Sequence, residues 1–142
     1  MAAAAGVGGS LHFLGNVSEE EKVDLLQRER VFLHTPVTAR GGGFEGFGIV
    51  YLEAAASGTP SIGTRESGAE DAVVDGTSGF LVAPRVDDVA AALERLIDEP
   101  ELRDRLAESA RARARGLCGD DSARRVLATS HPTLARGLPA RA

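Results

Sequence analysis

The sequence predicts an α/β fold in which a parallel β-sheet is covered by helices on both faces. Short apolar runs alternate with segments of helical periodicity along most of the 142-residue chain, and this order is typical of parallel sheets. The runs are apolar at consecutive positions, as in strands whose two faces are both buried. Glycine, proline and capping residues separate the runs from the helical segments.

Four apolar runs are predicted to form the strands of this sheet. They are residues 11–14, 30–34, 60–63 and 79–82. Gly15 and Asn16 interrupt regular structure after the first run. The second run is expected to be buried on both faces.

The first helix is predicted over residues 18–28 from a capping box. Ser18 stands three residues before Glu21, so the serine hydroxyl can accept from the first turn while the glutamate reaches back to the cap. Val23 and Leu26 are expected to face inward. The chain therefore enters its first helix at a defined residue.

Five further helical segments follow. An apolar helix is expected over residues 47–57, with Gly58 as its C-cap and Pro60 preventing continuation. Residues 69–74 are expected to form a helical turn. Val89, Leu93, Leu96 and Ile97 recur at helical spacing before Pro100. The remaining helices are expected over residues 101–115 and 121–129.

Composition and length restrict the class of protein. The length fits one domain, which we assign to residues 11–130, between a flexible N-terminus at 1–10 and a loose tail at 131–142. The formal net charge is −5, which argues against nucleic acid as a partner because phosphates require basic excess. The single cysteine, Cys118, fits a reducing compartment, and we expect a cytoplasmic location. Since no apolar run approaches about 20 residues, membrane association is expected only through parts absent from this chain.

A glycine-rich loop leads directly into the helix predicted at 47–57. Its glycines, among them Gly43 and Gly46, allow the backbone to approach a ligand closely. The first turn of a helix presents free N–H groups at the positive end of its dipole, which suits a phosphate. The amides of Phe47, Gly48 and Ile49 are therefore candidates to hold a diphosphate. Ligands of parallel sheets bind beyond the carboxyl ends of the strands, where this loop begins.

Glu53 is the one charged residue in this otherwise apolar helix. On a helical wheel it lies among Ile49, Leu52 and Ala56, so we expect it on a buried stripe. A buried carboxylate requires a partner. Two interpretations stay open: a protein donor satisfies it, or it reaches a ligand such as the paired hydroxyls of a ribose.

Glu45 precedes the same helix. One interpretation is a surface acid that compensates the helix dipole; the other places it where a sugar projects from the diphosphate. Glu45 and Glu53 are separated by roughly 12 Å along a helix axis, at ~1.5 Å per residue. That distance suits two contacts with one long ligand and not an acid–base pair at one bond.

Three other residues are possible contributors. Arg40 lies in the glycine loop, His34 ends a predicted strand near it, and Arg65 follows the third strand at the same sheet edge. A solvated arginine or a structural histidine is the alternative in each case. None of the three histidines, His12, His34 and His131, has metal-like spacing.

Glu45 and Glu53 form an E-x7-E pattern, and the run at 45–60 resembles retaining glycosyltransferases of family 4. The runs at 13–17 and 74–82 resemble the same family. The resemblance covers residues 11 to about 115. It implies the C-terminal half of a GT-B fold, which is a Rossmann-like three-layer αβα domain with a parallel sheet, here without its first strand and helix.

The resemblance also implies roles for these residues. Glu45 is the catalytic residue that contacts the donor sugar, and Glu53 binds the ribose. The amides of residues 47–49 hold the diphosphate, with Gly43 and Gly46 in the same donor loop. The substrate is a nucleotide-diphosphate sugar. Transfer retains the anomeric configuration, with the leaving phosphate assisting and with neither a metal nor another cofactor.

The sequence departs from the family pattern at several points. The Arg and Lys that neutralise the diphosphate lie in the family on elements that precede residue 11, and the single lysine of this chain, Lys22, stands elsewhere. The usual Gly-Gly pair after the third strand is Ser67-Gly68. The acceptor-binding N-terminal domain is absent, so the active cleft is incomplete. The acceptor is unknown. Alternatives to a transferase donor domain are a non-catalytic or truncated nucleotide-sugar-binding module and a GT-B-type nucleotide-sugar epimerase.

Overall fold

A three-stranded parallel sheet forms the centre of the molecule. The computed structural model describes residues 6, 8–36, 48–65 and 67–117. Within them the strand order is β1 (Phe32–Leu33), β2 (Ser61–Thr64) and β3 (Gly79–Val82). Phe32 pairs with Ser61, which in turn pairs with Gly79. The predicted parallel sheet is therefore confirmed.

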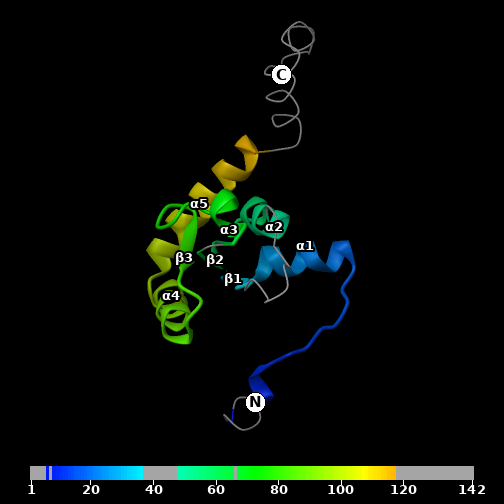
Figure 1. The fold of residues 1–142 in the computed structure, drawn as a ribbon. Helices are drawn as coiled ribbons and strands as arrows, with labels where there is room; N and C mark the ends of the chain where they lie inside the picture. Colours follow the sequence, from blue (N-terminus) through cyan, green and yellow to red (C-terminus); the bar gives the residue numbers. More distant parts are fainter. Residues whose placement is uncertain (1–5, 7, 37–47, 66, 118–142) are drawn as a thin grey trace, which may run out of the picture.

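Helices cover both faces of this sheet (Figure 1). α2 (Ile49–Ser57) and α3 (Ala69–Ala72) contact β2, while α4 (Val86–Asp98) and α5 (Pro100–Gly116) contact β3. α1 (Glu19–Arg28) packs against α2. A short 3-10 turn, η1 (Gly8–Ser10), precedes α1. This three-layer arrangement agrees with the predicted fold class.

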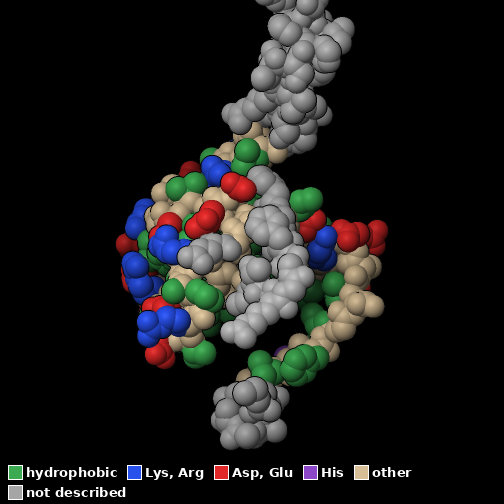
Figure 2. All heavy atoms as spheres, viewed as in Figure 1, with side chains coloured by type: hydrophobic (Ala, Val, Ile, Leu, Met, Phe, Trp, Pro, Cys, Tyr) green, Lys and Arg blue, Asp and Glu red, His purple; other side chains and the backbone are tan. Residues whose placement is uncertain are grey.

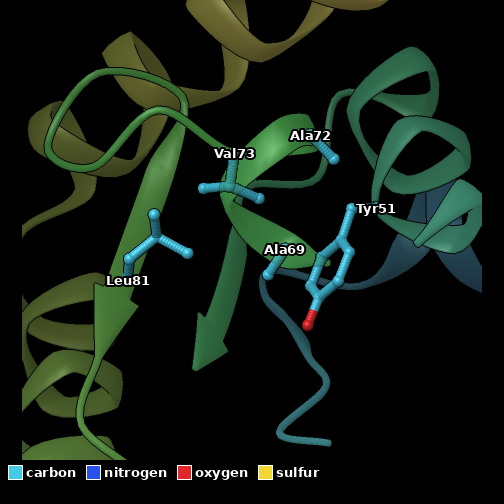
Figure 3. Packing of buried hydrophobic residues seen from close by; sticks show 5 residues of the cluster. All are labelled: Tyr51, Ala69, Ala72, Val73 and Leu81. Atoms are coloured by element: carbon cyan, nitrogen blue, oxygen red, sulfur yellow. The ribbon is translucent and has the colours of Figure 1, made fainter. Parts of the chain in front are cut away.

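Two apolar clusters lie on opposite faces of the sheet, because successive strand residues point to opposite sides. Leu81 packs with Tyr51, Ala69, Ala72 and Val73 beneath α2 and α3 (Figure 3). Its neighbours in β3, Phe80 and Val82, pack on the other cluster, which lies beneath α4 and α5. The buried members of that second cluster are Ile62, Ala92, Leu96, Leu102 and Leu106.

The predicted capping box at the start of α1 is present. The Glu21 amide donates to Ser18 Oγ at 3.2 Å, and the Ser18 amide donates to Glu21 Oε2 at 2.7 Å. The bond from the Ser18 backbone, followed by that from its side chain, lowers the pKa of Glu21. The stabilisation from this carboxylate is therefore present above its unfolded pKa and is lost as pH falls through the lowered value.

Ser18→Ala is expected to reduce the free energy of unfolding by about 1 kcal/mol, because an N-cap side chain satisfies an otherwise unpaired helix amide. Urea denaturation at neutral pH measures the loss. Ser109→Ala, in the interior of α5, is the control and is expected not to reduce stability. Equal stability of Ser18→Ala and the wild type would contradict the capping role.

The second half of α5 is hydrogen-bonded to the C-terminal ends of α2 and α3. Arg111 donates to the carbonyl of Ser57 at 3.3 Å, at the C-terminal end of α2. Arg113 donates to the carbonyls of Ala72 at 2.8 Å and Asp71 at 2.6 Å, at the end of α3. The last carbonyls of a helix have no partner within the helix. These two arginines supply partners for both helices.

Three expectations are wrong. Residues 11–14 form no strand, and Phe13 is 91% exposed; an apolar run becomes a strand only where another strand pairs with it. Val23 and Leu26 are both expected to face inward, but Val23 is 44% exposed and only Leu26 is buried. Leu33 in β1 is 44% exposed, because β1 is an edge strand of the described sheet. The predicted helix at 121–129 lies outside the described residues.

Candidate functional site

The N-terminus of α2 is built around Gly48. This glycine is the N-cap of the helix and has φ 66°, in the left-handed region. A Cβ at this position would lie 2.6 Å from the Tyr51 ring, which fills the space beside the backbone. Both the dihedral angle and the close approach therefore require glycine. With no side chain at the cap, the first turn of α2 is not capped by its own N-cap residue.

This turn lies at the carboxyl edge of the sheet, because α2 connects β1 to β2 and the two strands are parallel. Tyr51 is 1% exposed, and its hydroxyl donates to the carbonyl of His34 at 2.6 Å, just beyond β1. The Thr64 hydroxyl, at the end of β2, donates to the carbonyl of Pro36 at 2.8 Å. The first turn of α2 and the ends of both strands are thus held together.

His34 takes part in this arrangement mainly through its backbone. Its amide donates to Ile62 at 3.1 Å, and its carbonyl accepts from Tyr51. Its ring contacts the rings of Phe32 and Tyr51, with centroids 6.2 Å and 5.5 Å away, and these two rings also contact each other at 5.8 Å. These contacts give His34 a structural function at the site.

Glu53 lies one turn along α2 and forms an ion pair with Lys22 of α1. Lys22 Nζ is 2.9 Å from Glu53 Oε1 and 2.7 Å from Glu19 Oε2. Of the two open interpretations, a protein donor to Glu53 is present. The expected buried stripe is wrong: Ile49 is 68% exposed and the Glu53 side chain 35% exposed. The buried side chains of α2 are instead Tyr51, Ala54 and Ala55.

Lys22 is the residue at this site that sequence reasoning missed. The carboxylate of Glu19, and then that of Glu53, raise the pKa of Lys22. Its attraction to the two acids is therefore complete at neutral pH and is lost only as pH rises through the raised value. The spacing of Glu19 and Lys22 predicts their pairing on one helix, but no local pattern indicates a contact with Glu53.

The remaining predicted residues divide into two groups. Arg65 pairs with Asp75 at 2.5 Å and lines a cavity of about 380 Å³ with residues of β3 and α4, so the structure does not bring it to Glu53. The others lie outside the described residues: Arg40, Gly43, Glu45, Gly46 and Phe47.

Neither a metal-binding cluster nor a membrane-spanning helix is present in the described part of the chain. Among residues 6, 8–36, 48–65 and 67–117, no group of three or more His, Cys, Asp or Glu side chains is arranged to hold a metal ion. In the same residues, no helix has the length and apolar character needed to cross a membrane.

Comparison with known proteins gives a consistent family. The chain is 34% identical over 111 residues to a GDP-mannose-dependent monoacylated alpha-(1-6)-phosphatidylinositol monomannoside mannosyltransferase of Corynebacterium glutamicum, an alignment that covers 77% of this chain and 29% of that protein. It is 46% identical over 84 residues to D-inositol 3-phosphate glycosyltransferase of Frankia alni, covering 58% of this chain and 21% of that protein. The chain thus spans less than a third of the length of these relatives.

A solved structure shows the same fold. The crystal structure of Anabaena Alr3699/HepE in complex with UDP-glucose matches with a TM-score of 0.71 and 27% identity, over 80% of this chain and 29% of that chain. The structural neighbours are GT-B glycosyltransferases, in agreement with the predicted architecture. Residues 1–113 match the family described as Glycosyl transferases group 1. This chain belongs to the glycosyl transferases group 1 family.

Proposed function

We propose that this chain is the donor-binding domain of a retaining family 4 glycosyltransferase and binds a nucleotide-diphosphate sugar. The observation that carries the proposal is the first turn of α2. It opens at the carboxyl edge of a parallel sheet behind a glycine that has no side chain to cap it. Helix N-termini in this position favour phosphate groups. The UDP-glucose complex of the HepE neighbour supports the same class of ligand.

The proposal assigns a role to each part of this edge. The amides of Gly48 and Ile49, with that of Phe47, hold the diphosphate, since the helix dipole favours negative charge there. Glu53 accepts hydrogen bonds from the ribose hydroxyls. Glu45 contacts the sugar, and Gly43 and Gly46 allow close approach of the loop.

Three further features complete the proposal. Transfer retains the anomeric configuration without a metal. An acceptor-binding domain outside this chain supplies the other side of the active cleft. The protein acts in the cytoplasm, since one cysteine permits no intrachain disulfide.

Isothermal titration calorimetry with UDP-, GDP- and ADP-sugars tests the donor site. One of the three is expected to bind, and Glu53→Gln is expected to weaken that binding about 10- to 100-fold, because hydrogen bonds to a charged group contribute roughly 1.5–3 kcal/mol. Affinity is expected to be the same with magnesium and with excess EDTA.

Glu94→Gln is the matched control, because this exposed glutamate belongs to α4 on the opposite face of the sheet. Its affinity is expected to equal that of the wild type. Absence of binding by all three nucleotide sugars at millimolar concentration rules out a donor site in this chain. An unchanged affinity of Glu53→Gln rules out the ribose contact alone.

A further inference from the structure

We propose that Lys22 is a positioning residue of the donor site: it holds one oxygen of the Glu53 carboxylate and so directs the other toward the hydroxyls of a bound nucleotide. The inference rests on the proposed function, because it assigns a partner to the residue that contacts the ribose. Nothing in the local sequence marks Lys22 for this role. The structure brings the two residues together from different helices.

The contact is one-sided. Lys22 Nζ donates to Glu53 Oε1 at 2.9 Å. Among the residues that the structure describes, Glu53 Oε2 has no hydrogen-bond partner. The Glu53 side chain is 35% exposed, so this oxygen remains available to a ligand. A carboxylate fixed through one oxygen keeps lone pairs on both oxygens for a pair of hydroxyls.

Lys22 is itself held in place. Glu19, one turn earlier in α1, binds the same ammonium at 2.7 Å. Lys22 also lines a cavity of about 350 Å³ together with Leu25, Val31 and Phe32, and lysine stems commonly lie along apolar surface while the charge stays accessible. The ammonium is therefore held by two carboxylates, those of Glu19 and Glu53.

The helix that carries Lys22 is anchored to the segment that follows α2. Leu26 is 7% exposed, and its carbonyl accepts a hydrogen bond from the buried Thr59 hydroxyl. Thr59 lies directly after the C-cap of α2, Gly58. The relative position of Lys22 and Glu53 is thus set by the packing of α1 on α2 and not by the ion pair alone.

Charge gives the contact a second effect. A nucleoside diphosphate is an anion, and a carboxylate near its binding site repels it. α1 begins with the acidic residues Glu19, Glu20 and Glu21, and Figure 2 shows acidic side chains gathered over this helix. Lys22 lies between Glu19 and Glu53 and offsets part of this negative charge. Its removal therefore costs both the orientation of Glu53 and this compensation.

The decisive measurement is the affinity of the full chain for UDP, GDP and ADP, each titrated alone by calorimetry. Lys22→Met keeps the stem and removes the charge. For the diphosphate that the wild type binds, we expect the dissociation constant to rise about fivefold or more, which is roughly 1 kcal/mol. Lys22→Arg preserves the charge and is expected to restore most of the affinity.

Arg28→Met is the matched control. Arg28 lies on the same helix and forms an ion pair with Asp24 at 2.9 Å, so this variant also loses one cation from α1 but leaves Glu53 unaffected. Its affinity is expected to equal that of the wild type. A double-mutant cycle with Glu53→Gln separates positioning from general charge, because Lys22→Met should have a much smaller effect once Glu53 is neutral.

Lys22 also provides a spectroscopic readout, because it is the only lysine in the chain. Protein labelled with 13C-lysine should give one set of side-chain signals. We expect the Cε signal of Glu53→Gln to differ from that of the wild type. We also expect the wild-type signal to shift when the diphosphate that it binds is added. If Lys22 served only the stability of the fold, its substitution would lower the thermal midpoint. It would not change the ratio of the dissociation constants of variant and wild type, and ligand would not shift the Cε signal.

The outcomes separate the two proposals. If no diphosphate and no nucleotide sugar binds the wild type, the proposed function fails and this inference with it. If the wild type binds and Lys22→Met binds equally well, only the positioning role fails. Tighter binding by Lys22→Met also overturns it, because Lys22 would then compete with the ligand for Glu53.

Discussion

Gly48→Ala is expected to lower the free energy of unfolding by about 2–5 kcal/mol, the sum of two separate costs. A residue with a Cβ in the left-handed region loses about 1–2 kcal/mol. The new Cβ also meets the Tyr51 ring at 2.6 Å, and overpacking of this kind costs roughly 1–3 kcal/mol. Chemical denaturation followed by circular dichroism measures the loss. Because the turn that carries the candidate site must shift, nucleotide affinity should fall as well.

Gly76→Ala separates these two costs. Gly76 has φ 69° but nothing within 4 Å of its added Cβ. Gly76→Ala therefore has only the conformational cost of a Cβ in the left-handed region. We expect it to lose less stability than Gly48→Ala. Equal losses for the two variants would show that the contact with Tyr51 does not require glycine at position 48.

Leu96→Ala is expected to lower the free energy of unfolding by about 2–5 kcal/mol, the range for removing a fully buried leucine. Leu96 is 0% exposed and packs with Ile62, Leu102 and Leu106. These residues come from β2, α4 and α5, so the cavity would open where three elements meet. Urea denaturation monitored at two wavelengths measures the change and checks that unfolding remains two-state.

Ile97→Ala is the control for this variant. Ile97 is the next residue of α4 and is 48% exposed, so truncation there removes a similar number of carbons from a wetter position. Its loss is expected to stay below about 1 kcal/mol, since surface substitutions are usually small in effect. Similar losses at both positions would contradict the assignment of Leu96 to the core.

Features that depend on neighbouring residues could be predicted from the sequence. Ser18 and Glu21 form the expected capping box, and Gly58 takes the expected left-handed C-cap with φ 85°. At both caps a few adjacent side chains determine the local conformation. β3 also forms at the predicted residues, 79–82, but there β2 supplies the pairing partner.

Features that depend on distant partners could not be predicted. An apolar run such as 11–14 specifies an extended chain but not the strand that pairs with it, and Phe13 is accordingly exposed. The contact of Lys22 with Glu53 spans 31 positions. It follows from the packing of α1 on α2, which no spacing within either helix encodes. The helical wheel gave Glu53 apolar neighbours in sequence, but which side of α2 is covered is determined by the rest of the fold.

The two arginines in the second half of α5 have a consequence for exchanging this domain between members of the family. A chimera joined immediately after Asp98 would keep the sheet and α4 but take its last helix from another protein. Arg111 and Arg113 hold the carbonyls of Ser57, Asp71 and Ala72, at the ends of α2 and α3. A junction placed beyond Gly116 keeps these bonds within one parental sequence, so the helix that carries Glu53 retains its own support.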